Sequence, residues 1–204
     1  MRIRIIAQIA SILTVAVVSM CSASAHAQDA PAHKSAGRPE IALDYTYLRS
    51  NAPPASCTCF NLFGGSATFA WPLKLDKARI ALVGDITAAH ANSISSGGYS
   101  LTLSTYTAGA RYLPHVGRSP LQPFGQVLVG MVHSSGSLVN GGAANVPNAI
   151  AAFATNLGGG VDINTGSHIN LRLLEADYLL TLVDNGKNNI QNNLRLSGGV
   201  VIRF

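Results

Sequence analysis

Most acidic and basic residues occur singly along this 204-residue chain, and many of them alternate with apolar neighbours. Asp44 lies between Leu43 and Tyr45, and Arg195 lies between Leu194 and Leu196. Because successive strand residues point to opposite faces, such charges share one face and the apolar side chains share the other. Opposite charges enclosed on a common interior face are expected to pair.

The alternation therefore predicts an interior ion-pair network. Its expected members are Asp44, Arg79, Asp85, Arg172, Glu175, Asp177 and Arg195, and the same parity turns Glu40, Asp162 and Arg203 inward. An arginine on a lipid-facing position at the bilayer midplane would cost roughly 2–4 kcal/mol, which favours the inward assignment. The network is interpreted as a structural plug, and a gate for small ions is the alternative.

The alternation breaks within residues 168–180. Leu171 and Leu173 require one face and Arg172 the other, yet strict continuation would turn Glu175 and Asp177 to the apolar side. One extra residue at Leu173-Leu174 would bring both acids back to the face of Arg172. We therefore predict a β-bulge at this dipeptide.

Cys57 and Cys59 are the only cysteines after residue 27, in a segment that also contains Pro53-Pro54. In an exported protein they would meet an oxidising compartment, which favours a Cys57–Cys59 disulfide with a small, strained ring. Two alternatives remain: a metal site that joins both thiolates to His90 or His133, and free or intermolecular thiols.

His133-Ser134-Ser135 could in principle supply a general base and a nucleophile, and His90 is a further candidate base. Neighbours on one strand point to opposite faces, however, and no carboxylate lies beside either histidine in sequence to orient it. We expect no catalytic residue, no cofactor and no metal site.

The N-terminus predicts export. Arg2 and Arg4 precede an apolar run over residues 5–20, which ends in small residues and Ala25-His26-Ala27. Residues 1–27 are interpreted as a cleaved signal peptide, residues 28–39 as a periplasmic arm, and residues 40–204 as the folded domain. Loss of Arg2 and Arg4 lowers the formal charge from +5 to +3. The remaining basic residues form no stripe that would indicate nucleic-acid binding.

Composition favours a membrane barrel over other classes. The chain is 48% apolar and only 11% charged, yet no stretch past residue 20 has the roughly 18 apolar residues of a membrane helix. Eight segments of strand length, with short and long connections in alternation, predict an antiparallel meander. They are residues 40–49, 63–74, 78–90, 100–112, 121–133, 150–162, 168–180 and 192–204.

Aromatic residues are expected to form two girdles at the membrane boundaries. The periplasmic girdle should contain Trp71, Tyr112, Phe124 and Phe204. The outer girdle should contain Tyr47, Phe63, Tyr99, Phe153 and Tyr178. Tyr106 lies near the middle of its segment and fits neither girdle by this count.

The last segment, residues 192–204, ends in Val200-Val201-Ile202-Arg203-Phe204, with apolar residues at every second position before the terminal phenylalanine. It resembles the terminal strand of the small OmpA-like outer-membrane barrel family. The resemblance implies an all-β, eight-stranded antiparallel up-and-down transmembrane barrel in the bacterial outer membrane. It also implies that Phe204, Ile202 and Val200 are recognised by the barrel-assembly machinery. The peptidoglycan-binding domain of longer family members is not expected.

Eight strands enclose a lumen that side chains can fill, so a wide pore is not expected. We expect a non-enzymatic monomer at the cell surface, in contact with outer-membrane lipids and lipopolysaccharide, whose long loops meet an unknown partner. One alternative is a rim-located lipid A deacylase or acyltransferase, since a few small barrels of this shape use Ser and His there. A narrow ion channel and a soluble lipocalin-like carrier are the others.

Overall fold

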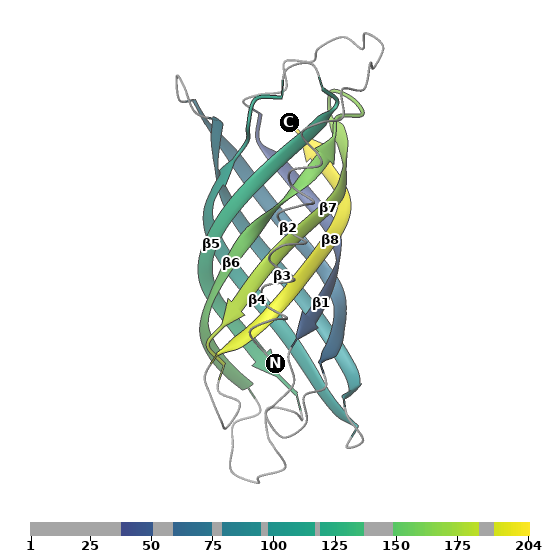
Figure 1. The fold of residues 1–204 in the computed structure, drawn as a ribbon, viewed down its shortest axis with the longest axis vertical. Helices are drawn as coiled ribbons and strands as arrows, with labels where there is room; N and C mark the ends of the chain where they lie inside the picture. Colours follow the sequence, from purple (N-terminus) through teal and green to yellow (C-terminus); the bar gives the residue numbers. More distant parts are fainter. Residues whose placement is uncertain are drawn as a thin grey trace, which may run out of the picture. The chain divides into compact units, whose positions relative to one another are not determined.

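The computed structural model describes residues 38–50, 59–74, 79–94, 98–116, 119–136, 149–183 and 190–204. Within them eight antiparallel strands close into one barrel, in which β1 pairs with both β2 and β8 (Figure 1). The fold class predicted from the alternation is confirmed. The strands are β1 (Glu40–Ser50), β2 (Phe60–Lys74), β3 (Arg79–Ile94), β4 (Tyr99–Tyr112), β5 (Leu121–Ser135), β6 (Ala149–Ile163), β7 (Ile169–Thr181) and β8 (Gln191–Arg203).

No helix among these residues is long and apolar enough to cross a membrane. The predicted signal peptide and nearly all of the predicted arm lie outside the described residues, as does Cys57.

The two ends of the barrel differ in their connections. Three connections, over residues 75–78, 113–120 and 164–168, lie at what we call the turn end. The other four, over residues 51–59, 95–98, 136–148 and 182–190, lie at the loop end. The connection at 95–98 is shorter than the one over residues 91–99 that the predicted segments leave, because β3 continues to Ile94. Ala91 and Ile94 are buried there, and the pairing with β4 shifts register between them.

The strands are steeply inclined, as their pairing shows. From Glu40, successive partners around the barrel lead to Ala70, Val83, Gly109, Leu128, Asn156, Leu179 and Asn193 and return to Ser50, the other end of β1. A barrel with this stagger has strands tilted by roughly 35–45°. On each step of this circuit, from β1 through β2 toward β8, the next partner therefore lies about one residue nearer the loop end. This inclination brings Tyr106, near the middle of β4, to the level of Tyr47 on β1.

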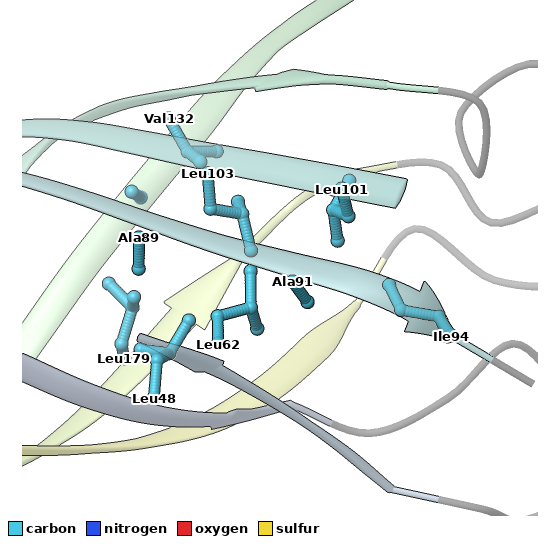
Figure 2. Packing of buried hydrophobic residues seen from close by; sticks show 10 residues of the cluster. Leu48, Leu62, Ala89, Ala91, Ile94, Leu101, Leu103, Val132 and Leu179 are labelled. Carbon is cyan, nitrogen blue, oxygen red and sulfur yellow. The ribbon is translucent and has the colours of Figure 1, made fainter. Parts of the chain in front are cut away.

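The interior has an apolar layer at the loop end. Figure 2 shows its side chains packed together. Seven strands contribute to it, and its residues are at most 7% exposed. They are Leu48, Leu62, Ala89, Ala91, Ile94, Leu101, Leu103, Val132, Ala154 and Leu179. A smaller apolar cluster of Ala70, Ala81, Val83 and Leu128 lies nearer the turn end, on the β2–β5 side. Charged residues occupy much of the remaining interior.

The exterior carries the aromatic side chains in two groups. Toward the loop end, the rings of Tyr47 and Phe63 lie 5.5 Å apart, and toward the turn end those of Phe69 and Trp71 lie 6.2 Å apart. Two expected girdle members are placed differently. Phe124 is buried in the interior, and Tyr99 packs against the apolar layer. Both residues have inward parity, which their positions near strand ends concealed.

Candidate functional site

Arg195 on β8 lies near the centre of the interior charges and is 1% exposed. Its guanidinium lies 2.7 Å from a carboxylate oxygen of Asp85, 2.7 Å from Asp177 and 2.8 Å from Glu175. It also donates a 2.7 Å hydrogen bond to the hydroxyl of Thr87. One cation thus joins β8 to β3 and to β7.

Arg172 on β7 forms a second centre. Its Nε lies 2.9 Å from Asp162, and its Nη1 lies 2.8 Å from Glu175 and 3.2 Å from Asp44. Because Glu175 contacts both Arg172 and Arg195, the two centres form one continuous network. The predicted members Asp44, Asp85 and Asp177 all lie within it.

The network extends to the turn end through Glu40 and Arg203, which were predicted to face inward, and through Arg111 and Gln126, which the sequence prediction left out. Arg111 on β4 lies 3.3 Å from Glu40 and donates hydrogen bonds of 3.1 and 2.8 Å to Gln126. Gln126 in turn donates a 3.1 Å hydrogen bond to Glu175, and Arg203 lies 3.1 Å from Glu40. The parity of Arg111 is opposite to that of Tyr106 and Tyr112, and this signal could have identified it.

Phe124 contacts two of these cations. The guanidinium carbon of Arg111 is 4.1 Å from the centre of the Phe124 ring, and that of Arg172 is 4.8 Å away. Both distances are within the range of cation–π attraction. The ring therefore stabilises each of the two cations.

The bulge predicted at Leu173-Leu174 is confirmed. The pairing of β7 with β8 shifts register between Arg172 and Glu175, and both leucines are exposed on the outside of the barrel. The pairing with β6 shifts at the same place. The extra residue keeps Arg172, Glu175 and Asp177 on the interior face.

The prediction that Arg79 belongs to the network is wrong. Arg79 is the first residue of β3 and is exposed at the turn end, where water replaces the enclosed lumen. It forms no ion pair with any other residue that the structure describes. Its parity is inward, but parity alone does not show that a position lies beyond the last enclosed level.

The buried charges of the described lumen comprise six carboxylates and four guanidiniums. The acids are Glu40, Asp44, Asp85, Asp162, Glu175 and Asp177, and the bases are Arg111, Arg172, Arg195 and Arg203. Oδ1 of Asp44 has no hydrogen-bond partner among the residues that the structure describes. No group of three or more His, Cys, Asp or Glu in the described part of the chain could hold a metal ion. The chemistry this arrangement supports is ion pairing that fills the barrel, with two more carboxylates than guanidiniums.

No protein-family model matches this sequence, and no curated protein matches it. Among solved structures, Neisserial surface protein A is similar at a TM-score of 0.60 and 16% identity, over 81% of this chain and 97% of that one. Ail, the attachment invasion locus protein of Yersinia pestis, is similar at a TM-score of 0.55 and 14% identity, over 82% and 99%. This chain has the fold of the eight-stranded outer-membrane barrels.

Ail has also been solved in complex with the heparin analogue sucrose octasulfate, and that structure is similar at a TM-score of 0.50 and 13% identity, over 81% of this chain and 99% of that one. Identities this low concern the fold alone. The finer resemblance to the OmpA-like family stays a prediction.

Two histidines, His90 and His133, face outward near the loop end. Nδ1 of His90 lies 2.8 Å from the hydroxyl of Thr102, and its Nε2 donates a 2.7 Å hydrogen bond to Oδ1 of Asn92. Both ring nitrogens of His90 are therefore engaged within the protein.

His133 and Ser134 lie on opposite faces of β5. His133 is exposed, whereas Ser134 is buried and donates a 3.4 Å hydrogen bond to the carbonyl of Ile150. Ser135 shares the face of His133. Cys59 is exposed, and the predicted Cys57–Cys59 disulfide falls outside the described residues because Cys57 does.

Proposed function

We propose that this chain is an integral protein of a bacterial outer membrane, with its turn end in the periplasm and its loop end at the cell surface. Its role there is non-enzymatic, structural or adhesive, and is exerted through the loop end. The observation that carries this proposal is a reversal of side-chain polarity along the strands.

Between the two aromatic groups, the outward residues are apolar and many are large, such as Leu43, Leu82 and Val127, while charges lie inside. Beyond the loop-end aromatic group, polar residues face outward on six of the eight strands, and the interior holds the apolar layer together with a few buried polar residues such as Ser50 and Asn193. These outward residues are Arg49, Asn61, His90, Thr102, Ser104, His133 and Asn192. On β6 and β7 the outward residues, Phe153 and Leu180, stay apolar.

This reversal supports a bilayer around the middle of the barrel and water around its loop end. A strand surrounded by lipid places apolar residues outside, and a strand in water places them inside. In a soluble carrier, the continuous outer band of exposed leucine, valine and tyrosine would be an aggregation liability. The band therefore favours a membrane protein over the lipocalin-like alternative.

The interior supports a closed barrel rather than a channel. The apolar layer spans the lumen at the loop end, with Leu62 and Val132 both 0% exposed. An ion passing this level would exchange its hydration for a lumen filled mainly by apolar side chains, with only a few buried hydroxyl and amide groups, such as those of Ser50 and Asn193, beside them. Purified protein in planar bilayers should therefore show no conductance, and steady single-channel currents would contradict this part of the proposal.

The rim offers little support for hydrolysis. Ser134 is turned away from His133 and bonded to a backbone carbonyl, and no described carboxylate contacts His133. Incubation of the purified protein with lipopolysaccharide should leave the acyl chains of lipid A intact, which mass spectrometry can check.

Recognition at the surface should differ from that of a polyanion receptor. Ail was solved with a polysulfated ligand. In the described residues at the loop end of this chain, Arg49 is the one lysine or arginine. Polar and apolar contacts are thus better represented on this rim than fixed positive charge.

Fractionation and thiol labelling test the placement. The protein should sediment with outer membranes and migrate differently on gels before and after boiling. After mild reduction, a membrane-impermeant maleimide should label Cys59 in intact cells. In a Cys57→Ser/Cys59→Ser background, Ser119→Cys at the turn end should react only after the membrane is permeabilised. The reverse labelling pattern would contradict the orientation.

A further inference from the structure

Two polar residues follow the loop-end aromatic group on β1 and β2. Arg49 lies two residues beyond Tyr47, and Asn61 lies two residues nearer the loop end than Phe63. Arg49 and Asn61 are exposed and point outward, on the same face as these aromatic side chains. The sheet pairs Arg49 directly with Asn61, and directly opposite residues have β-carbons about 5 Å apart. The guanidinium and the amide, which we call the rim pair, therefore lie side by side on the outer surface.

A hydrogen bond orients the amide of the rim pair. The hydroxyl of Tyr47 donates a 2.8 Å hydrogen bond to Oδ1 of Asn61, so the acceptor of the amide is engaged within the protein. Its Nδ2 carries two N–H donors on the other branch of the side chain. Arg49, whose guanidinium has five N–H donors and no acceptor, lies beside Tyr47 and Cys59. The rim pair thus presents N–H donors and one fixed positive charge.

The rim pair lies at the depth expected for lipid headgroups. Aromatic girdles mark the boundary between hydrocarbon and headgroups, and two residues of strand cover roughly 7 Å. Side chains two residues beyond Tyr47 and Phe63 therefore meet headgroups rather than acyl chains. In the sequence of the four loop-end connections, Asp184 is the single acidic residue. An anion bound at this end would therefore meet little fixed negative charge from the connections.

We propose that Arg49 and Asn61 bind the phosphate monoester group of an outer-leaflet lipid, such as a phosphate of lipid A. This inference rests on the proposed outer-membrane placement, with the loop end at the cell surface. A phosphate monoester offers several anionic oxygens, of which a guanidinium binds two in a bidentate pair and the amide N–H groups bind another. A zwitterionic phosphodiester offsets the attraction with its own cation and binds less well. The rim pair therefore selects one class of lipid headgroup.

The test places the single tryptophan of the chain beside the rim pair. Trp71 is the only tryptophan, and the ring of Phe63 lies 5.5 Å from that of Tyr47, so Trp71→Phe/Phe63→Trp gives a local reporter. This protein, purified from outer membranes, is reconstituted into phosphatidylcholine vesicles with increasing fractions of brominated phosphatidic acid, a phosphate monoester, or brominated phosphatidylcholine. Bromine quenches tryptophan only at short range, so the two curves give the relative association constant of the lipids. We expect phosphatidic acid to be preferred about fivefold, which corresponds to ~1 kcal/mol for one cation near an anionic headgroup.

Three further substitutions in the reporter protein decide the outcome. Arg49→Gln should lower the preference to about one. Asn61→Leu keeps the cation but removes the amide donors, and should lower the preference at least about twofold through loss of a charge-assisted hydrogen bond. The matched control Arg38→Gln removes an exposed cation at the turn end and should keep the full preference. Equal quenching by both lipids in the reporter, or an unchanged preference in Arg49→Gln or in Asn61→Leu, would overturn the paired site.

Inorganic phosphate distinguishes a lipid from a soluble source of the same group. At constant ionic strength, millimolar phosphate should leave the lipid preference unchanged, because the bilayer holds the lipid phosphate at high effective concentration beside the site. Loss of the preference would instead identify soluble phosphate as the ligand and overturn the assignment to lipid. The native protein reports separately on the proposed function, since absence of quenching of Trp71 by either lipid would overturn the membrane placement itself.

Discussion

At the scale of single residues, Arg195 places one guanidinium against the carboxylates of Asp85, Glu175 and Asp177. Replacement by methionine would keep much of the side-chain volume but leave three acids enclosed without their cation. Breaking a buried pair in this way costs roughly 3–5 kcal/mol. We therefore expect Arg195→Met to unfold at a markedly lower urea concentration than the native protein. Unfolding in detergent can be measured by the fluorescence of Trp71.

Arg79 supplies the matched control for that experiment. It is also an arginine on a barrel strand, but it is exposed and has no carboxylate partner among the described residues. Arg79→Met should change the free energy of unfolding by no more than about 0.5 kcal/mol. Similar midpoints for Arg195→Met and the native protein would show that the network contributes nothing to stability.

Gly160 on β6 makes room for Phe124. A β-carbon at Gly160 would lie 2.7 Å from Cζ of Phe124 and 2.5 Å from the carbonyl oxygen of Leu174. Because the backbone oxygen cannot move easily, Gly160→Ala should displace the ring from Arg111 and Arg172 and destabilise the barrel by roughly 1–3 kcal/mol. Gly84→Ala, where a β-carbon meets nothing within 4 Å, should leave the urea midpoint unchanged.

The sequence could predict the face to which each of these residues points. It could not predict whether the position lies within the enclosed lumen. The predicted inward side chains of Asp44, Asp85 and Arg172 are buried, because each is flanked by apolar neighbours that must face outward. Arg79 has the same inward parity but lies beyond the enclosed level. Phe124 could not be assigned to the interior because an aromatic residue near a strand end fits a girdle equally well, and only its neighbours in space distinguish the two.

At the scale of elements, the bulge gives β7 one residue more than β6 and β8 have over the same stretch of the sheet. Leu173 and Leu174 together lie opposite Gly198, and β6 likewise pairs Val161 and Asp162 with Leu174 and Arg172. Deletion of Leu174 should therefore yield a regular ladder in which Glu175 and Asp177 still face inward. We expect this deletion variant to fold, as judged by heat-modifiable migration on gels.

Deletion of Ala176 is the informative comparison. It also shortens β7 by one residue, but outside the bulge, so it would either turn Asp177 to the lipid face or shift the rest of the strand out of register. This variant should fail to reach the folded form. If both deletions folded equally well, the bulge would not be what sets the faces of β7.

The reversal of polarity at the loop end explains which strand ends could not be predicted. In β3, residues after His90 place alanine and isoleucine inward and asparagine outward, a pattern of a strand in water rather than in lipid. A prediction based on lipid-facing alternation stops where that rule stops applying. β3 therefore extends four residues past its predicted end, and Tyr99, expected in a girdle, packs inside.

At the scale of the whole molecule, strand inclination decides which residues share a level in the membrane. Tyr106 fits no girdle when positions are counted along β4, but the stagger from Glu40 to Ser50 around the barrel places it level with Tyr47. The number of strands can be counted from the sequence, whereas the stagger depends on the register of every pair. That register could not be predicted because the short outward residues of β3 and β4, such as Ala88 and Ala108, allow several pairings.

Assembly in the cell and stability of the finished barrel should depend on Phe204 in different ways. The resemblance of the last strand to OmpA-like barrels predicts that Phe204 is read by the assembly machinery. In the folded structure its side chain is 62% exposed, and its backbone N–H donates a 3.1 Å hydrogen bond to the carbonyl of Pro39. Phe204→Asp keeps that backbone bond and removes no packed contact from the interior.

Phe204→Asp refolded in detergent should therefore have the same urea midpoint as the native protein, while the amount of folded protein in the outer membranes of cells should fall sharply. Phe69→Asp, which alters a similarly exposed aromatic residue away from the C-terminus, controls for loss of an aromatic anchor and should reduce the outer-membrane level far less. A loss of stability would lower both the urea midpoint and the amount of folded protein in outer membranes. A loss of recognition by the assembly machinery would lower only the second. Undiminished insertion of Phe204→Asp would remove the assembly signal from this chain.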